Sequence, residues 1–315
     1  MFKNIFIIIF GIGLLIFGAN LLVKGANKIA QKLKIPEIII GLTIVAIGTS
    51  LPELIVTIIS ATKDSTELII GNVLGSNISN LLLILGVISI IKPVKTDIKT
   101  RKIHIPVLIL STLLVFLMGL GFLGSQKLII TKIDGLVLIF IGIIYYIYTI
   151  SEELKNENES EIEDKDINII TSIINILIGS ILLKYGGDFV VDSSINIAKD
   201  FGISEKIIGL TIIGLGTSLP ELVTSIMAIL KQNEDLAIGN IIGSCIMNLL
   251  FILGIGAVIS PIYFGYGFNQ TIFLLIASTI LIWLYSIAEQ NKKINRHNGI
   301  VLVSIFILHF VKLFI

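Results

Sequence analysis

The stretch GLTIVAIGTSLPEL, residues 41–54, places a proline and a glutamate in the middle of a long apolar run. The chain repeats it 168 residues later, at 209–222, as GLTIIGLGTSLPEL. A proline inside a helix removes a backbone hydrogen bond and clashes with the carbonyl group four residues earlier. A charged side chain in such a run is costly within a membrane, where it generally marks a functional pathway. The two copies therefore predict broken helices built around functional carboxylates.

The composition of the chain predicts an all-α polytopic membrane protein. Of its 315 residues, 55% are hydrophobic and only 14% are charged, and the mean hydropathy is +1.00. A soluble domain cannot bury so much apolar surface, whereas a membrane-spanning helix needs about 20 mostly apolar residues. We expect ten spans, at residues 4–23, 36–60, 67–91, 104–123, 130–150, 168–187, 204–230, 236–259, 270–288 and 298–314.

Scarce cysteine and histidine exclude several classes of site. Cys245 is the only cysteine, which excludes a disulfide scaffold and a cysteine-rich metal centre. The three histidines lie far apart in the sequence, and none stands beside the serines of the proline motif, so neither a catalytic zinc centre nor an intramembrane hydrolase is expected. The net charge of +1 comes without a basic face for nucleic acid. We expect no enzyme, no cofactor and no nucleic-acid partner.

The distribution of lysine and arginine sets the predicted orientation. Ten spans put both termini on one side of the membrane, and 15 of the 23 Lys and Arg residues fall in the loops after odd-numbered spans. Cytoplasmic loops carry the excess of positive charge, so we expect these loops in the cytoplasm and both termini outside the cell, in the plasma membrane. The acidic stretch 151–167 is then a cytoplasmic linker, and it lacks the glycine and the ligand spacing of an EF-hand.

The repeat extends beyond the proline motif. The same offset of 168 residues aligns GNVLGSNISNLLLILG at 71–86 with GNIIGSCIMNLLFILG at 239–254. Two long matches at one offset indicate an internal duplication with five spans in each half, 1–150 and 168–315. A repeat with an odd number of spans re-enters the membrane from the opposite side, so the halves are expected to have inverted topology. Many secondary transporters have this architecture and bind their substrate near the midplane, where broken helices meet.

Oxygen-bearing side chains surround each predicted break. Thr49 and Ser50 lie four and three residues before Glu53, so all three can share one helical face. Pro52 and Pro220 break the two helices and free carbonyl groups, which need a partner inside a membrane. Hard cations such as calcium take about 6–8 oxygen ligands, and sodium is also hard, so the set predicts a site for either ion. Its further members are Thr217, Ser218 and Glu221, with Asn72, Ser76 and Asn80 and their counterparts Asn240, Ser244 and Asn248.

Other interpretations of these residues stay open. The glutamates also fit a structural role, the prolines fit simple kinks, and the asparagines and serines fit interhelical hydrogen bonds. Paired carboxylates also fit a calcium/proton exchanger, because coupled acids carry protons at shifted pH values. A passive cation channel is a third functional class, and it predicts downhill flux without a counter-ion. Asp188 and Asp192, at the outer end of the sixth span, are expected to be solvated.

The motif GTSLPEL followed by GN..GS, present in both halves, resembles the alpha repeats of the calcium/cation antiporter superfamily, in its prokaryotic sodium/calcium exchanger branch. The resemblance covers the whole chain and implies an antiporter that exchanges sodium for calcium by alternating access, with the two ions as substrates. It implies that Glu53 and Glu221 bind both ions and that Thr49 and Thr217 add oxygens for calcium. The implied sodium sites also use Ala46, Ser50, Ser76, Gly214, Ser218 and Ser244, with Asn80 and Asn248 at the centre.

The resemblance has three further implications. The first and sixth spans lack the motifs and contain several glycines, so they are expected to form a moving gate. Asn248 stands where characterised exchangers often carry aspartate, which removes one possible charge from the site. The proton-coupled branch usually has a glutamate soon after GN, whereas this chain has GNVLGSN and GNIIGSC, which favours sodium. No protein partner is predicted, and the expected state is a monomer.

Overall fold

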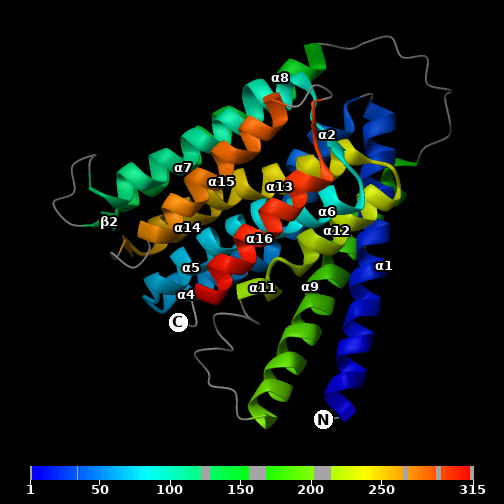
Figure 1. Ribbon diagram of the computed structural model, residues 1–315, viewed down its shortest axis with the longest axis horizontal. Helices are drawn as coiled ribbons and strands as arrows, with labels where there is room; N and C mark the ends of the chain where they lie inside the picture. Colours follow the sequence, from blue (N-terminus) through cyan, green and yellow to red (C-terminus); the bar gives the residue numbers. More distant parts are fainter. Residues whose placement is uncertain are drawn as a thin grey trace.

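Long apolar helices make up almost all of the described chain in the computed structural model (Figure 1). The structure describes residues 2–33, 35–121, 128–155, 168–201, 214–264, 269–288 and 292–312. The α-helices are α1 (Phe2–Leu33), α2 (Glu37–Ile40), α3 (Ala46–Thr49), α4 (Leu51–Thr62), α5 (Thr66–Ile78), α6 (Leu85–Ile91), α7 (Ile105–Gly119), α8 (Lys132–Lys155), α9 (Ile169–Asp200), α11 (Gly214–Gly216), α12 (Leu219–Leu230), α13 (Glu234–Met247), α14 (Leu253–Ile259), α15 (Asn269–Ala288) and α16 (Arg296–Lys312). The expected all-α class is confirmed.

Short π-helical turns and two small strand pairs complete the described elements. The π turns are η1 (Gly41–Val45), η2 (Ser79–Ile84), η3 (Thr100–His104) and η5 (Asn248–Ile252). Strand β1 (Val94–Lys95) pairs antiparallel with β4 (Lys293–Ile294), and β2 (Ile129–Ile130) pairs antiparallel with β3 (Ile262–Tyr263). Each strand has two residues, so the pairs tie helix ends together and form no sheet layer.

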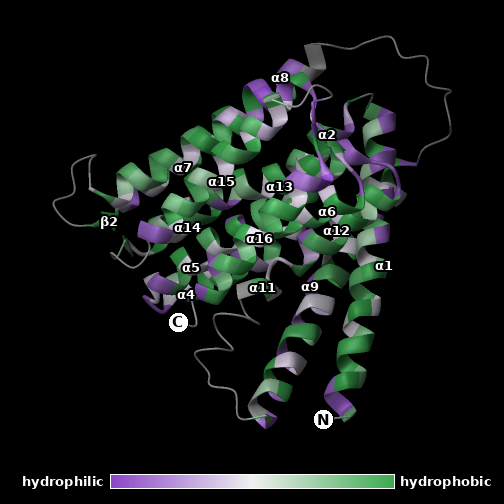
Figure 2. Cartoon of the chain, viewed as in Figure 1, coloured by the Kyte–Doolittle hydropathy of each residue, from purple (hydrophilic) through white to green (hydrophobic). Residues whose placement is uncertain are grey.

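The helices have the length and composition of membrane spans. Among the described residues, seven helices are long and apolar enough to cross a membrane, or eight if the bent pair Glu37–Thr49 and Leu51–Thr62 counts as one span. Hydrophobic residues run along the helices and hydrophilic ones gather toward their ends, as at the end of α8 (Figure 2). This count covers fewer spans than the ten expected from the sequence, partly because residues 202–213 lie outside the described ranges.

Two helices continue well past the ends that the sequence predicted for them. Both α1 and α9 have 32 residues, whereas the predicted spans were 4–23 and 168–187. The lysines at 24 and 28 suggested a loop, but the buried face of α1 continues through Ala26 and Ile29. A helix that goes on packing keeps its hydrogen bonds after its other face becomes polar, so hydropathy alone ended these spans too early.

Glycines let α1 and α9 approach each other closely as they run side by side (Figure 1). A Cβ atom at Gly18 would lie 2.8 Å from the carbonyl oxygen of Gly179, and one at Gly179 would lie 2.7 Å from that of Gly18. Gly11 and Gly186 meet in the same way, at 2.8 Å in both directions. Small residues at a helix crossing permit such backbone contact. Each of these pairs therefore joins the two halves of the chain.

The segments 71–86 and 239–254, which repeat at the offset of 168 residues, form the centre of the bundle. In the most apolar 18-residue stretches of the spans Thr66–Ile91 and Glu234–Ile259, 72% and 78% of the residues are buried, whereas in that of Phe2–Leu33 only 28% are. Helix α13 packs against α12 of its own half and against α2 and η1 of the other half. The proline motifs thus lie against the most buried part of the molecule, while α1 and α9 lie at its edge.

Candidate functional site

Each proline motif coincides with an interruption between two helices. Ser50 separates α3 from α4 with φ −85° and ψ 9°, and Ser218 precedes α12 with φ −86° and ψ 2°. At Ser50 the helix axis bends by 48°. Pro52 and Pro220 lie in the first turns of α4 and α12, where the backbone N–H groups have no intrahelical partner. Residues 209–213, the start of the second motif, lie outside the described residues.

The interruptions place two glutamates at new helix N-termini inside the protein. Glu53 lies in the first turn of α4 and Glu221 in the first turn of α12, and both are 0% exposed. A helix N-terminus carries a partial positive charge that stabilises a nearby carboxylate. The proline interrupts the helix, and the new N-terminus then stabilises the carboxylate of the glutamate that follows it.

A serine connects the first carboxylate to the second half of the chain. Ser76 Oγ donates to Glu53 Oε1 at 3.3 Å. The same hydroxyl lies 3.4 Å from Thr217 Oγ1, four residues before the other glutamate. Ser76 therefore touches the glutamate of its own half and the threonine of the other.

The corresponding contacts recur around Glu221 in the second half, which receives one further hydrogen bond from the first half. Ser244 Oγ donates to Glu221 Oε1 at 3.4 Å and lies 3.4 Å from Thr49 Oγ1. In addition, Ser50 Oγ donates to Glu221 Oε1 at 3.0 Å. Its counterpart Ser218 is also buried, but the Ser218 hydroxyl has no hydrogen-bond partner among the described residues. The two carboxylates and their hydroxyls thus form one polar cluster that both halves build.

Two asparagines support this polar cluster from behind. The Asn72 side-chain amide donates to the backbone carbonyl of Glu53 at 3.0 Å. The Asn240 amide donates to Ser225 Oγ at 3.1 Å, and its oxygen accepts a hydrogen bond from Thr49 Oγ1 at 3.1 Å. These contacts orient the residues that face the carboxylates.

Asn77 belongs to the same buried region, and sequence reasoning missed it. Its amide donates to the backbone carbonyl of Cys245 at 3.1 Å, and its side-chain oxygen accepts from Asn248 Nδ2 at 3.0 Å. Cys245 is the residue 168 positions after Asn77, so each of these two residues contacts its own counterpart. The 168-residue offset could have predicted this contact, because a residue close to the axis that relates two repeats lies next to its counterpart in the other repeat.

Several buried atoms of the cluster have no hydrogen-bond partner among the described residues. They are Glu53 Oε2, Glu221 Oε2, both polar atoms of the Asn80 side chain, Asn248 Oδ1 and Ser218 Oγ. A buried polar group without a partner costs about 1–3 kcal/mol. Most of these atoms are oxygens, the ligands that hard cations such as calcium and sodium take. The cluster can therefore accept a cation without giving up its internal hydrogen bonds.

The π turns and two backbone positions complete the predicted set. Asn248 begins η5, and Asn80 lies in η2 at the corresponding position. Such turns inside α-helices occur frequently at functional sites. The Ala46 carbonyl accepts from Ser50 N–H at 2.9 Å and from Thr49 Oγ1 at 3.3 Å. Gly214 is the first residue of α11, and no described contact brings it or Ala46 to a carboxylate.

A pocket of about 170 Å³ leads toward the cluster between the two prolines and α9. Its lining includes Pro52, Pro220 and Thr217, together with Asp188 and Asp192 of α9. The sequence predicted these aspartates to be solvated, and Asp192 is exposed while the Asp188 side chain is 45% exposed. That they also line this pocket was not predicted. Asp188 also pairs with Lys184 at 2.6 Å.

Comparisons with known proteins show which sequences and structures this chain resembles. The sequence matches a family model described as sodium/calcium exchanger protein over residues 3–151 and 171–314. It is 37% identical over 288 residues to the putative antiporter CaxA of Alkalimonas amylolytica, covering 89% of each chain. It is 30% identical to the sodium/calcium exchanger MaX1 of Methanosarcina acetivorans, covering 91% of each chain. The structure is similar to that of the sodium-calcium exchanger NCX_Mj soaked with 2.5 mM Na⁺ and 10 mM Sr²⁺, with a TM-score of 0.84, 30% identity and 98% of each chain covered.

Proposed function

Because this chain belongs to the sodium/calcium exchanger family, we propose that it is an antiporter that exchanges sodium ions for calcium by alternating access. The observation that carries the proposal is the pair of fully buried glutamates, Glu53 and Glu221, joined in one cluster by serine and threonine hydroxyls. Calcium and sodium are the substrates. Relatives are named as antiporters and exchangers, in keeping with transport as the activity.

We assign the ligands on the basis of the unpaired oxygens and the hydroxyl contacts. Glu53 and Glu221 bind both ions through the carboxylate oxygens that have no described partner. Thr49 and Thr217 add oxygens for calcium, and Asn80 and Asn248 contribute neutral amide oxygens at the centre. The proposed sodium sites use, besides the glutamates, Ala46, Ser50, Ser76, Gly214, Ser218 and Ser244.

Charge balance explains why such a site exchanges ions and does not leak them. Two ionised carboxylates buried in one cluster repel each other as like charges. Calcium, or sodium ions in its place, neutralises both. A charged site at the centre of a bilayer costs several kcal/mol. The protein therefore changes the side of access much less readily when the cluster is empty than when it holds its ions. One ion must therefore replace the other before access changes.

We further propose that ten spans form two inverted five-helix halves, 1–150 and 168–315, joined by the linker 151–167. Support comes from contacts that recur at the 168-residue offset, as Ser76 with Thr217 and Ser244 with Thr49. The close glycine crossing of α1 and α9 fits a pair of helices that slide as a gate. Most of the linker lies outside the described residues. Its cytoplasmic location, the extracellular termini, the plasma membrane and the monomeric state remain predictions.

Isotope flux in proteoliposomes tests the proposed exchange. Sodium-loaded vesicles should accumulate radioactive calcium, and the uptake should disappear when the sodium gradient is collapsed. Uptake driven by a pH gradient without sodium would select the calcium/proton exchanger, and downhill flux without any counter-ion would select a channel. Glu53→Gln should abolish uptake while the protein remains folded. The matched control is Glu67→Gln, because Glu67 is exposed near the start of α5, and this variant should transport normally.

A further inference from the structure

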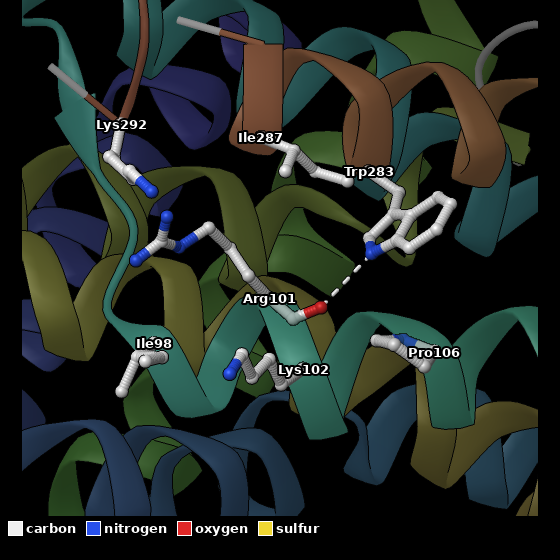
Figure 3. A pocket seen from close by; sticks show the side chains of 7 residues that line it. All are labelled: Ile98, Arg101, Lys102, Pro106, Trp283, Ile287 and Lys292. Atoms are coloured by element: carbon white, nitrogen blue, oxygen red, sulfur yellow. Dashed lines mark hydrogen bonds between the residues drawn. The ribbon is translucent and has the colours of Figure 1, made fainter. Parts of the chain in front are cut away.

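A second, larger pocket lies away from the glutamates, where η3 meets the end of α15. Its volume is about 460 Å³. None of its residues takes part in the proposed ion exchange. The lining consists of Ile98, Arg101, Lys102, Pro106, Trp283, Ile287 and Lys292 (Figure 3).

Three positively charged side chains line this basic pocket, and none of them has an ion-pair partner among the described residues. Figure 3 shows the side chains of Arg101 and Lys292 pointing toward one another, with Lys102 on the same side of the pocket. No carboxylate among the described residues lies within ion-pair distance of any of the three. The Arg101 Nε atom donates to the Asp97 backbone carbonyl at 3.0 Å, which leaves the outer nitrogens of the guanidinium facing the pocket. Like charges that meet in this way repel each other, and an anion between them would offset the repulsion.

The backbone holds these groups in place. Trp283 Nε1 donates to the Arg101 carbonyl at 3.0 Å and so ties α15 to η3. The Lys292 carbonyl accepts two hydrogen bonds from Thr96, from N–H at 3.0 Å and from Oγ1 at 3.1 Å. Lys292 has φ 53°, in the left-handed region that a lysine seldom adopts. The position of Lys292 is therefore set by its backbone, and its side chain is left available for a ligand.

The pocket is apolar as well as basic, and it opens at the end of membrane-spanning helices. Ile98 is 57% exposed and Ile287 is 42% exposed. The spans Thr100–Gly119 and Asn269–Ala288 both have an end here. Tryptophan is enriched at the membrane–water interface, where Trp283 then lies. The sequence predicts this end of the spans to be cytoplasmic, and the cytoplasmic leaflet carries the anionic lipids.

We propose that this pocket binds the phosphate headgroup of an anionic membrane lipid through Arg101, Lys102 and Lys292. An arginine guanidinium matches phosphate oxygens with two parallel hydrogen bonds, and the lysines add point charges. The exposed isoleucines and Trp283 offer the start of the acyl chains an apolar surface. A free phosphate ion would use the charges but leave this apolar surface to water, so the lining favours a lipid.

The chain contains a built-in probe for this binding, because Trp283 is its only tryptophan. In detergent, phosphatidylglycerol with brominated acyl chains should quench Trp283 fluorescence at much lower concentration than brominated phosphatidylcholine. Each basic residue near an anionic surface contributes about 1 kcal/mol. Arg101→Gln with Lys292→Gln should therefore weaken binding of the anionic lipid about 30-fold, at a tenfold change for every ~1.4 kcal/mol.

Matched control variants distinguish lipid binding in the pocket from non-specific attraction of an anionic lipid to positive charges elsewhere. Lys28→Gln with Lys32→Gln removes two positive charges from the end of α1, away from the pocket, and should leave the quenching unchanged. Lys292→Gln alone should show part of the loss with the fold intact, because the described contacts of Lys292 to Thr96 use its backbone. Equal quenching by the two lipids, or an equal loss in the α1 control, would overturn the proposal. Relief of quenching by millimolar inorganic phosphate would show a soluble anion in the pocket and would overturn the assignment to a lipid.

Discussion

Gly18→Ala tests the backbone contact on which the proposed gate of α1 and α9 depends. A Cβ atom at this position would lie 2.8 Å from the Gly179 carbonyl oxygen and 3.0 Å from Leu183 N, where ordinary contact begins at 3.4 Å. The helices must therefore separate by about 0.6 Å to admit one methyl group. Overpacking of this kind costs about 1–3 kcal/mol, partly offset by about 1 kcal/mol because alanine favours the helix over glycine.

The same helix provides the matched control. Gly13 has nothing within 4 Å of its Cβ position, so Gly13→Ala gains the helix preference without a clash. Gly18→Ala should therefore be about 1–3 kcal/mol less stable than Gly13→Ala, a difference of several degrees in melting temperature. Cys245 is the only cysteine and is buried, so a thiol-reactive dye reports unfolding in detergent. Sodium-driven calcium uptake should fall in Gly18→Ala and persist in Gly13→Ala.

Two results would refute this reasoning, one the backbone contact itself and the other its role in transport. Equal melting temperatures for the two variants would mean that α1 and α9 do not meet backbone to backbone at Gly18. A lower melting temperature for Gly18→Ala with normal uptake would leave the contact in place but remove its role in transport. Gly179→Ala added to Gly18→Ala should cost less than the sum of the two single changes, because both methyl groups occupy one contact.

Three further predictions concern the polar cluster and its approach. Ser218→Ala removes a buried, unpaired hydroxyl, so it should not lower the melting temperature but should raise the sodium concentration needed for half-maximal exchange; a normal sodium requirement would exclude Ser218 as a ligand. Asn77→Leu leaves Asn248 Nδ2 without its partner and should lower stability by about 1–3 kcal/mol, measured by the same dye assay; unchanged stability would contradict the contact. Asp192→Asn should raise the calcium concentration for half-maximal uptake about twofold at low salt and less at high salt, because salt screens a charge that attracts cations to the passage. An effect independent of salt would argue against such attraction.

The repeat made much of the site accessible from the sequence. Because the two copies share one offset, each residue near the first proline had a known counterpart, and an odd number of spans per half predicted that the copies face each other. The structure does bring Glu53 and Glu221 into one hydroxyl cluster. The predicted all-α class followed from composition, since hydropathy responds to the solvent around a helix.

Other features depend on packing that periodicity does not encode. The lysines of α1 suggested a helix end, but the helix continues because its opposite face stays buried against its neighbours. Asn77 was overlooked because its counterpart is a cysteine, so no shared motif marked the position. That the aspartates of α9 line the passage could not be predicted, because the sequence does not tell which side of a long helix faces it.

One difference between the two halves bears on how access alternates. Ser50 donates to Glu221, whereas its counterpart Ser218 has no described partner, and the pocket reaches the prolines from the side of Asp188 and Asp192. If the halves exchange roles when access changes, the opposite state has the counterpart bond, from Ser218 to Glu53. Ser50→Ala then destabilises only the present state, by about 0.5–1.5 kcal/mol for a lost hydrogen bond.

Thiol labelling measures that shift in population. Val56 lines the passage, so a Val56→Cys variant should react with a membrane-impermeant reagent while the buried Cys245 stays silent. Adding Ser50→Ala should slow the labelling about 2- to 10-fold, since 1.4 kcal/mol corresponds to a factor of ten. Adding Ser218→Ala removes a bond that only the opposite state makes and should, if anything, speed it. Equal rates in the two double variants would mean that the hydrogen-bond difference between Ser50 and Ser218 plays no part in choosing the side of access.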